Sequence, residues 1–454
     1  MHALIRRQRD YYLSHATREL AARREALRRL RAALLAWEPR LCEALQSDLG
    51  KQPTESYMSE IGMVLSGIRD LLAHLRRWSR PRSFWGPLAQ FPSRCRVERE
   101  PYGVTLVVSP WNYPLLLALD PLAASLAAGN TVILKPSEDA PATSAALAEM
   151  LAETFSPELV AVVQGGREVA EQLLQQQVDY IFFTGSPAVG KRVMAAAAAH
   201  LTPVTLELGG KSPCIVAADA DVALAARRIA FGKVLNAGQT CVAPDYVFVH
   251  RSRREEFITA YRRAVEQMVG FDPLHNEALP HIINRRHYER VMRLLEGVTP
   301  ALGGQGDPES LRIAPALLTG VTPESPCMQE EIFGPLLPLM TFESLEEVEA
   351  FVQVRPRPLA CYLFTRDRGT EQRFMSLLSF GGGCVNDTVI HLAVPELPFG
   401  GVGNSGMGAY HGRTGFETFT HAKSILRKGT WLDLPFRYQP YSRFKAWVLR
   451  LFLR

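Results

Sequence analysis

The chain has 454 residues, of which 47% are hydrophobic and 21% charged, which excludes a disordered or fibrous protein and predicts two or three globular domains. The formal net charge of +5 is modest for this length, and no basic stretch is interleaved with aromatic residues, so a nucleic-acid partner is not expected. The 7 scattered cysteines, without a Cys-x-x-Cys pair or a histidine at zinc spacing, indicate neither disulfides nor a metal site and fit a reducing, cytoplasmic compartment.

The N-terminal region is predicted to be helical. Residues 1–35 are dense in Arg, Ala and Leu and contain acids but no apolar core, so they indicate an exposed helix rather than a secretory signal, with a basic import presequence as the alternative. Apolar residues at three- and four-residue spacing predict amphipathic helices over 18–49, bent at Pro39, and over 55–78. No run of about 18 apolar residues occurs, so no segment is expected to span a bilayer.

From residue 104 onward, short apolar runs alternate with helical stretches. This alternation is typical of a parallel sheet covered on both faces, as in nucleotide-binding domains. The predicted strands lie at 104–108, 131–135, 159–163 and 180–183, and the predicted helices at 142–154 and 167–175. After Pro203 the same texture continues, beginning with a strand at 203–207, and predicts a second α/β domain that contains Cys241.

Two glycine-rich motifs resemble nucleotide signatures but lack the required context. The G-x-G-x-x-G match over 401–406 follows no buried strand and opens no helix, so it is discounted. The G-x-x-x-x-G-K match over 185–191 is followed by Arg192, where a phosphate loop needs Ser or Thr for magnesium, so ATP chemistry is disfavoured.

A dinucleotide site is nevertheless indicated. The strand 180–183 leads through a small-residue turn, 184–190, into a helix starting near Val189, whose free N–H groups suit a pyrophosphate; a plain tight turn is the alternative. At the end of a neighbouring strand, Lys135 and Glu138 can bind ribose hydroxyls, or else belong to an ordinary solvated loop. Taken together, the two features favour a dinucleotide.

Cys241 is the candidate nucleophile. It follows a small-residue, amide-rich turn, Asn236-Ala-Gly-Gln-Thr240, of a kind that brings backbone close to a ligand. A free cysteine is otherwise more often a small buried hydrophobic residue, and the turn alone leaves the two interpretations balanced.

A series of motifs, in this order along the chain, resembles the aldehyde dehydrogenase superfamily. The motifs are Pro110-Trp-Asn-Tyr-Pro114, Lys135-Pro-Ser-Glu138, Phe183-Thr-Gly-Ser186, Glu207-Leu-Gly-Gly-Lys-Ser-Pro213, Asn236-Ala-Gly-Gln-Thr-Cys241, Glu330-Glu-Ile-Phe-Gly-Pro335 and Pro398-Phe-Gly-Gly401. The short N-terminus and the ending Phe436-Arg-Tyr-Gln-Pro-Tyr441 are most similar to the class 3 branch, which includes fatty aldehyde dehydrogenases.

The resemblance implies a fold and a division of the chain. The fold is α/β, with a Rossmann-type cofactor domain, a second α/β catalytic domain and a small bridging β element. The implied boundaries are 1–80 and 104–206 for the NAD(P)-binding domain, 207–415 for the catalytic domain, 81–103 and 416–440 for the bridging and oligomerisation element, and 441–454 for the tail. A homodimer is expected.

The resemblance also assigns catalytic roles that aldehyde oxidation requires. Cys241 is the nucleophile, because a thiolate forms a hydride-donating adduct and then a thioester that water cleaves readily. The Asn112 amide and the Cys241 N–H are the oxyanion donors, and Glu207 is the general base for the attacking water.

The cofactor implied by the resemblance is NAD or NADP, and no metal is implied. Glu331, rather than Glu330, is expected to bind the nicotinamide-side ribose, with Phe333 as an aromatic wall. Lys135 and Glu138 match the adenosine-ribose contacts, and because Lys135 can accept a 2′-phosphate the choice between NAD and NADP stays open. The further expected cofactor contacts are Trp111, Ser137, Gly185, Ser186, Val189, Gly190 and Leu208. Pro187 departs from the family pattern and removes one N–H from the pyrophosphate turn.

The C-terminal tail, 442–454, carries no acidic residue. On a helical wheel Arg443, Arg450 and Arg454 cluster in one arc, with Lys445 outside it, and apolar residues that include Phe444 cover another side. Too short to span a bilayer, the tail either lies peripherally in a membrane interface, with Trp447 at headgroup level, or packs on the protein or on a dimer partner.

The expected function is NAD(P)-dependent oxidation of a medium- to long-chain aliphatic or aromatic aldehyde to its acid. The alternatives are a cofactor-independent cysteine esterase that uses the same thiol and oxyanion donors, and a non-catalytic structural protein. The aldehyde pocket cannot be located from the sequence.

Overall fold

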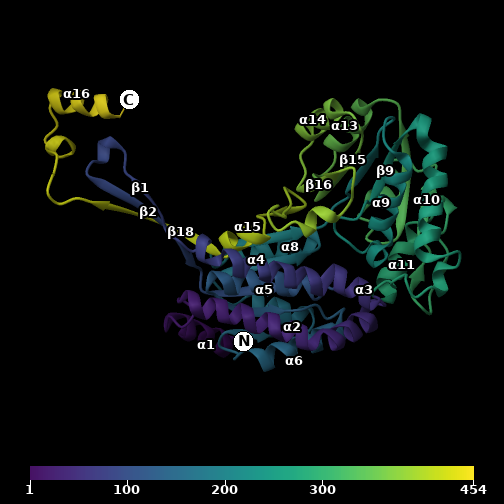
Figure 1. Ribbon diagram of the computed structural model, residues 1–454, viewed down its shortest axis with the longest axis horizontal. Coiled ribbons are helices and arrows are strands. Elements are labelled where there is room, and N and C mark those ends of the chain that lie inside the picture. The colour runs from purple at the N-terminus through teal and green to yellow at the C-terminus, as the bar shows by residue number, and fades with distance from the viewer. Residues whose placement is uncertain (454) are drawn as a thin grey trace.

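The computed structural model describes residues 1–453, and Arg454 lies outside the described residues. Two sheets with their helices form the body, and a narrow arm extends from it (Figure 1). This arrangement confirms the predicted α/β class with two α/β parts and a small bridging β element.

A six-stranded sheet forms the first part of the body, in the order β17-β7-β6-β3-β4-β5. Neighbouring strands are parallel except β17, which runs antiparallel to β7. The strands are β3 (Val104–Val108), β4 (Thr131–Lys135), β5 (Val160–Val162), β6 (Tyr180–Gly185), β7 (Val204–Leu208) and β17 (Gly406–Met407). The apolar pattern after Pro203 suggested that β7 begins the second part, but β7 pairs with β6 and belongs to this sheet, and the implied boundary at residue 206 also places most of β7 here. A buried apolar run has the same composition in either sheet, so only the pairing decides its place.

Helices cover both faces of this sheet. Val107 and Phe182 point into the core shared with α2 (Leu20–Leu49), α4 (Gly62–Trp78), α5 (Leu116–Ala128) and α6 (Pro141–Thr154). Leu106 and Phe183, one position away, point into a second core formed with α1 (His2–Leu13), α7 (Arg167–Leu174) and α8 (Pro187–Ala198). The alternation of side chains along each strand therefore supplies two apolar layers.

The N-terminal region differs from the single exposed helix that was predicted. It forms two helices, α1 and α2, and α1 packs on the sheet through Ile5 and Gln8. The Gln8 side chain is fully buried and donates to the carbonyls of Val132 and Pro157, both at 3.0 Å. The residue pattern missed this packing because the buried face of α1 is short. The helix predicted over 55–78 is present as α3 (Pro53–Ser56), the π-helical η1 (Tyr57–Ile61) and α4.

A seven-stranded sheet forms the second part, in the order β10-β13-β14-β9-β8-β15-β16. Its strands are β8 (Pro213–Val216), β9 (Tyr246–His250), β10 (Thr299–Leu302), β13 (Ala316–Thr319), β14 (Leu336–Phe342), β15 (Ala360–Phe364) and β16 (Gly382–Val385). Its helices are α9 (Val222–Val234), α10 (Arg254–Val269), α11 (Arg285–Arg293), α12 (Pro326–Gln329), α13 (Leu345–Gln353) and α14 (Arg368–Leu377). A small hairpin, β11 (Gly306–Asp307) and β12 (Arg312–Ile313), lies beside them, and α15 (Gly412–Thr418) returns the chain to α4 and α5.

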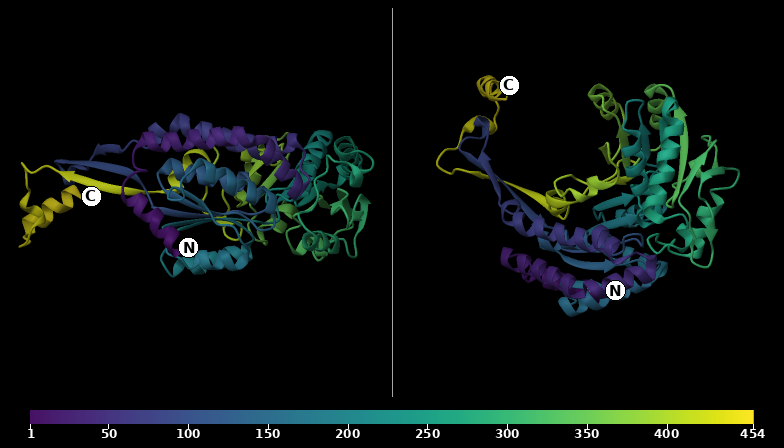
Figure 2. Two further views of the ribbon diagram at one scale, coloured as in Figure 1. Left: turned by 90° about the horizontal axis from the view of Figure 1, so that it is seen from below. Right: turned by 45° about the vertical axis from the view of Figure 1, so that its right-hand side comes forward.

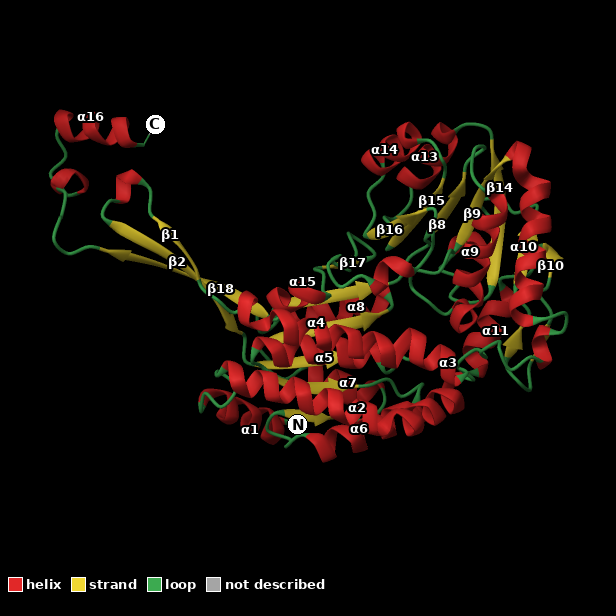
Figure 3. Cartoon of the chain, in the orientation of Figure 1, coloured by secondary structure: helices red, strands yellow, loops and turns green. Residues whose placement is uncertain are grey.

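The arm is a three-stranded antiparallel sheet, β1-β2-β18. Its strands are β1 (Arg82–Trp85), β2 (Ser93–Pro101) and β18 (Thr420–Lys428), and η7 (Pro435–Arg437) and α16 (Arg443–Phe452) follow at its far end. Figure 2 shows that the arm projects clear of the body in both views, and Figure 3 shows how few elements it contains. Within residues 1–453, no helix combines the length and apolar character needed to cross a membrane.

Candidate active site

The turn that carries Cys241 follows α9 and is held in an unusual backbone conformation. In η3 (Leu235–Gly238), Asn236 and Ala237 both have left-handed φ angles, 51° and 52°. Such conformations cost free energy in residues with side chains and persist only where the surroundings fix them. Asn236 supplies two such restraints, since its N–H donates to Glu55 Oε1 at 2.8 Å and its Nδ2 donates to the Asn112 carbonyl at 2.7 Å.

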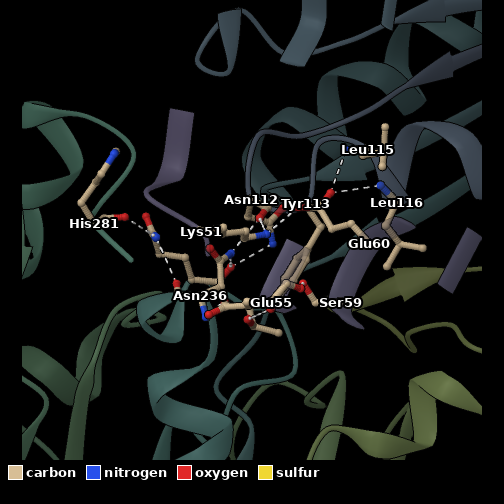
Figure 4. A network of polar contacts seen from close by, with 12 residues as sticks. Lys51, Glu55, Ser59, Glu60, Asn112, Tyr113, Leu115, Leu116, Asn236 and His281 are labelled. Carbon is tan, nitrogen blue, oxygen red and sulfur yellow. Dashed lines mark hydrogen bonds and ion pairs between the residues drawn. The ribbon is translucent and has the colours of Figure 1, made fainter. Parts of the chain in front are cut away.

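The loop 110–114 docks directly on this turn. Asn112 Nδ2 donates to the Gln239 carbonyl at 3.1 Å, and the Tyr113 hydroxyl lies 2.6 Å from Thr240 Oγ1. Figure 4 shows Asn112 and Asn236 meeting within one polar network. The structure therefore brings the predicted oxyanion donor, Asn112, to the turn of the predicted nucleophile.

Cys241 lies on the wall of an apolar cavity of about 170 Å³. The other lining residues that give it this character include Met58, Met63, Leu116, Leu117, Phe231 and Ile390. These side chains come from η1, α4, α5, α9 and the short helix η6 (Ile390–Ala393). Because they are scattered along the chain and share no local motif, the sequence did not reveal this pocket.

Glu207 lies near the carboxyl end of β7, opposite Thr184 of β6 and Gly406 of β17. It is buried, and neither carboxylate oxygen has a hydrogen-bond partner among residues 1–453. Burial raises the pKa of Glu207 well above its usual range. The carboxyl group therefore holds a proton to higher pH here than it does in water.

Burial also raises the pKa of the Cys241 thiol, and the carboxyl groups of Glu331 and Glu207 raise it further. The protonated thiol is therefore favoured, and it must lose its proton during the reaction to become the nucleophilic thiolate.

A second cavity, of about 600 Å³, lies beside the first turn of α8. Pro187 and Lys191 of α8, Gly209 and Gly210 after β7, and Glu331 are among its lining residues. The helix starts at Pro187 rather than near Val189 as predicted, because the Ser186 side chain caps it by accepting from the Val189 N–H at 3.4 Å. Pro187 thus occupies the first helical position, where its missing N–H costs no helical bond.

The turn before α8 approaches β7 closely. A Cβ on Gly190 would lie 2.6 Å from a methyl carbon of Leu208, so a larger residue here would force the Leu208 side chain to move. Gly185, Ser186, Val189, Gly190 and Leu208, all predicted cofactor contacts, are therefore neighbours at one end of the sheet. Free N–H groups in a first helical turn suit an anionic group.

Glu330 and Glu331 both line the 600 Å³ cavity, and Glu330 also forms an ion pair with Arg290 at 2.8 Å. Burial raises the pKa of Glu331 to about 8, and its Oε1 has no partner among the described residues. A Cβ on Gly209 would lie 1.9 Å from Glu331 Oε2, so the glycine makes room for the carboxyl group. A free acceptor at the wall of a cavity fits a ribose hydroxyl group of a dinucleotide.

The other predicted cofactor residues form two groups. Trp111 and Phe333 meet edge to face with ring centroids 5.3 Å apart. Lys135 Nζ donates to Glu138 Oε2 at 2.7 Å, and Ser137 Oγ accepts from the Asp139 N–H at 3.2 Å. The cluster 135–138 lies at the end of β4 and does not line the 600 Å³ cavity.

Lys233 is a residue near the site that the sequence reasoning missed. Its side chain is fully buried, and its amine has no hydrogen-bond partner among residues 1–453. Burial lowers its pKa to about 8, and Asp245, Lys211 and Glu331 are the charged groups that act on it. The sequence feature that could have identified Lys233 is its position, as a lysine within the otherwise apolar end of α9.

Comparison with known proteins agrees with this geometry. The model of the aldehyde dehydrogenase family matches residues 2–425. The 4,4'-diaponeurosporen-aldehyde dehydrogenase of Staphylococcus aureus is 44% identical over 438 residues, which cover 96% of this chain and 95% of the relative. Aldehyde dehydrogenase family 3 member A2 of Rattus norvegicus is 41% identical and covers 100% of this chain and 94% of its own. A solved substrate-bound state of Staphylococcus aureus AldH superposes with a TM-score of 0.97 at 42% identity, covering 100% of this chain and 99% of that one.

Proposed function

The chain belongs to the aldehyde dehydrogenase family and oxidises an aldehyde with NAD or NADP, and we propose that its substrates are medium- to long-chain aliphatic or aromatic aldehydes. The observation that carries this proposal is the apolar cavity beside Cys241. Apart from the thiol and the Tyr hydroxyls, His411 is the one ionisable side chain among the residues that line this cavity. Burial lowers the pKa of His411 to about 4. An uncharged hydrocarbon or aromatic group therefore fits the cavity, and a charged one does not.

In the proposed reaction, the Cys241 thiol passes its proton to solvent water, and the sulfur bonds to the aldehyde carbon. The Asn112 amide and the Cys241 N–H donate to the resulting oxyanion, a contribution of about 3 kcal/mol per donor. NAD or NADP, when bound, would supply the acceptor for the hydride that leaves this adduct. The ionised Glu207 carboxylate takes a proton from the water that cleaves the thioester and returns it to the leaving Cys241 sulfur, so that the carboxylic acid and the free thiol are released.

The same proposal assigns the cofactor contacts. The free Oε1 of Glu331 holds the ribose beside the nicotinamide, and the Trp111 and Phe333 rings flank it. Lys135 and Glu138, with Ser137 beside them, hold the adenosine ribose. The turn before α8 supports the pyrophosphate through Gly185, Ser186, Val189, Gly190 and Leu208.

Two partner surfaces belong to this proposal. Trp85 and Leu88 on the arm are 78% and 79% exposed, and such large apolar side chains favour a second copy of the chain as the cover, which gives a homodimer. At the arm's end, α16 exposes Phe444, Trp447 and Leu451 beside Arg443 and Arg450, which favours peripheral contact with a membrane surface. The free cysteines fit a cytoplasmic enzyme.

A panel of aldehydes from acetaldehyde to hexadecanal, together with benzaldehyde, tests the substrate class with NAD and with NADP. The proposal expects KM to fall as the chain lengthens. The variant Ile390→Glu, at the half-exposed edge of the cavity, should raise KM for long aldehydes about tenfold and spare acetaldehyde. Leu397→Glu, equally exposed but outside the cavity, is the matched control. A KM independent of chain length and of Ile390 would overturn the proposal.

A further inference from the structure

We propose that Lys51 and Glu60, a buried ion pair, position Asn112 for the reaction. Neither residue touches the reacting atoms, so both are positioning residues, and the inference rests on the proposed role of Asn112 as an oxyanion donor. The pair lies in the network of Figure 4, which joins the segment 51–60 to the loop 112–116 and to the turn of Cys241.

The first contact is between Lys51 and the Asn112 backbone. Both Lys51 and Glu60 are fully buried, and Lys51 Nζ lies 2.6 Å from Glu60 Oε1. Lys51 Nζ also donates to the Asn112 carbonyl at 3.2 Å and lies 4.1 Å from the centre of the Tyr113 ring. One ammonium group therefore restrains two consecutive residues of the loop.

The second contact is between Glu60 and the end of the same loop. Glu60 Oε2 accepts from the N–H groups of Leu115, at 2.8 Å, and Leu116, at 3.2 Å. These N–H groups belong to the start of α5, where they have no partner inside the helix. Lys51 and Glu60 thus hold the two ends of the loop, and the bond between them sets the distance from one end to the other.

The third contact ties this assembly to the nucleophile. The Asn112 carbonyl that Lys51 binds also accepts from Asn236 Nδ2, and the Asn236 N–H donates to Glu55 in the same segment 51–60. The segment 51–60 therefore restrains both the loop of the Asn112 amide and the turn of the Cys241 N–H, the two proposed oxyanion donors. A buried ion pair stabilises a fold little more than an apolar pair of equal volume does, so the specific effect expected here is orientation. Oxyanion stabilisation depends steeply on such orientation.

The experiment is a double-mutant cycle between Glu60→Gln and Asn112→Ala, read by the rate of the pre-steady-state NAD(P)H burst with a saturating aldehyde. Glu60→Gln should slow the burst about 10- to 100-fold and leave KM for NAD(P) within about twofold. Asn112→Ala should slow it about 100- to 1,000-fold. In the Asn112→Ala background, Glu60→Gln should cause no further loss, because it acts through the amide that is already absent. Hydrolysis of p-nitrophenyl acetate without cofactor should follow the same pattern.

Glu349→Gln is the matched control, because it removes a buried, ion-paired glutamate of α13 that bonds Arg373 and has no contact with the loop 112–116. It should leave the burst rate unchanged. If thermal unfolding shows that Glu60→Gln alone does not fold, the double variant Lys51→Met/Glu60→Gln replaces it in the experiment. The double variant leaves no unpaired buried charge. It should show the same burst defect as Glu60→Gln.

Two results would overturn the inference, and only the second would also contradict the proposed role of Asn112 as an oxyanion donor. If the effects of Glu60→Gln and Asn112→Ala multiply, or if Glu60→Gln matches Glu349→Gln, the positioning role fails and the proposed reaction stands. If Asn112→Ala itself keeps the wild-type burst rate, the oxyanion assignment fails together with the positioning role.

Discussion

The Asn112 side-chain amide donates a 3.1 Å hydrogen bond to the Gln239 carbonyl, shortly before Cys241 in the chain. The bond joins a loop that follows β3 of the first sheet to a turn that follows α9 of the second part. Gln239 accepts one proton of the Asn112 amide, and in the proposed reaction the other proton is donated to the substrate oxygen. The proposed oxyanion site therefore exists only where the two parts of the body meet.

The proposed nucleophile predicts that Cys241→Ala abolishes aldehyde-dependent NAD(P)H formation, because no other thiol lines the apolar cavity of the described chain. Cys384→Ala is the control, since Cys384 is also a free, partly exposed thiol but lies outside that cavity. Its activity should stay within about twofold of wild type. Turnover by Cys241→Ala, measured as NAD(P)H absorbance, would contradict the assignment.

The contrast between Cys241 and its pocket shows what the sequence reveals. Cys241, Glu207 and Glu331 lie in contiguous motifs whose residue types already suggest their chemistry, and the strands β3 to β7 follow from local apolar patterns. The apolar cavity and the contacts of Lys51 arise from segments far apart in the chain, so no local pattern marks them. For the same reason, the place of β7 in the first sheet depends on its pairing and not on its composition.

The role of Glu207 as base for thioester hydrolysis predicts that its removal affects steady-state turnover but not the initial burst of NAD(P)H. Glu207→Gln should keep a burst of NAD(P)H close to one equivalent of enzyme, because the thiol and the oxyanion donors are intact. Steady-state turnover should fall about 100- to 10,000-fold, the range lost when a general base is removed. Stopped-flow absorbance measures both phases. Loss of the burst together with turnover would instead place Glu207 before hydride transfer.

The raised pKa of Glu207 predicts the pH dependence of the same step. Burial raises this pKa well above the usual range, so the carboxylate, which is the base, becomes populated only as pH rises. Hydrolysis of the thioester should therefore accelerate from neutral to alkaline pH in the wild type and should respond less in Glu207→Gln. Single-turnover decay of the acyl-enzyme checks this. A rate that falls between pH 7 and 9 would rule it out.

Asp120 of α5 predicts a pH-dependent change in stability. Burial raises its pKa from 3.8 to about 7, and it lies 3.8 Å from His411. Between pH 3.8 and about 7, Asp120 holds a proton in the folded chain that it has lost in the unfolded chain. The contribution of Asp120 to the stability of the folded chain therefore falls as pH rises. Asp120→Asn should therefore match wild type near pH 4 and exceed its unfolding free energy by about 2 to 4 kcal/mol near pH 8. Urea unfolding at both pH values measures the difference, and an equal difference at both would contradict the shift.

The tail helix α16 predicts binding to anionic membranes. Trp447 and Leu451 are exposed, and Arg443 and Arg450 form no ion pair with any of residues 1–453, whereas Lys445 Nζ donates to the Tyr438 and Pro440 carbonyls. Each basic residue near an anionic surface contributes about 1 kcal/mol, so Arg443→Glu/Arg450→Glu should weaken binding at least about 30-fold, and added salt should weaken the wild type in the same direction. Flotation with phosphatidylserine-containing liposomes measures this for the full chain, for the double variant and for a chain ending at Gln439. Equal flotation of the full and shortened chains would contradict membrane binding by α16 and favour its packing on protein. If the same truncation also weakens the dimer, the surface that α16 contacts belongs to the second copy of the chain.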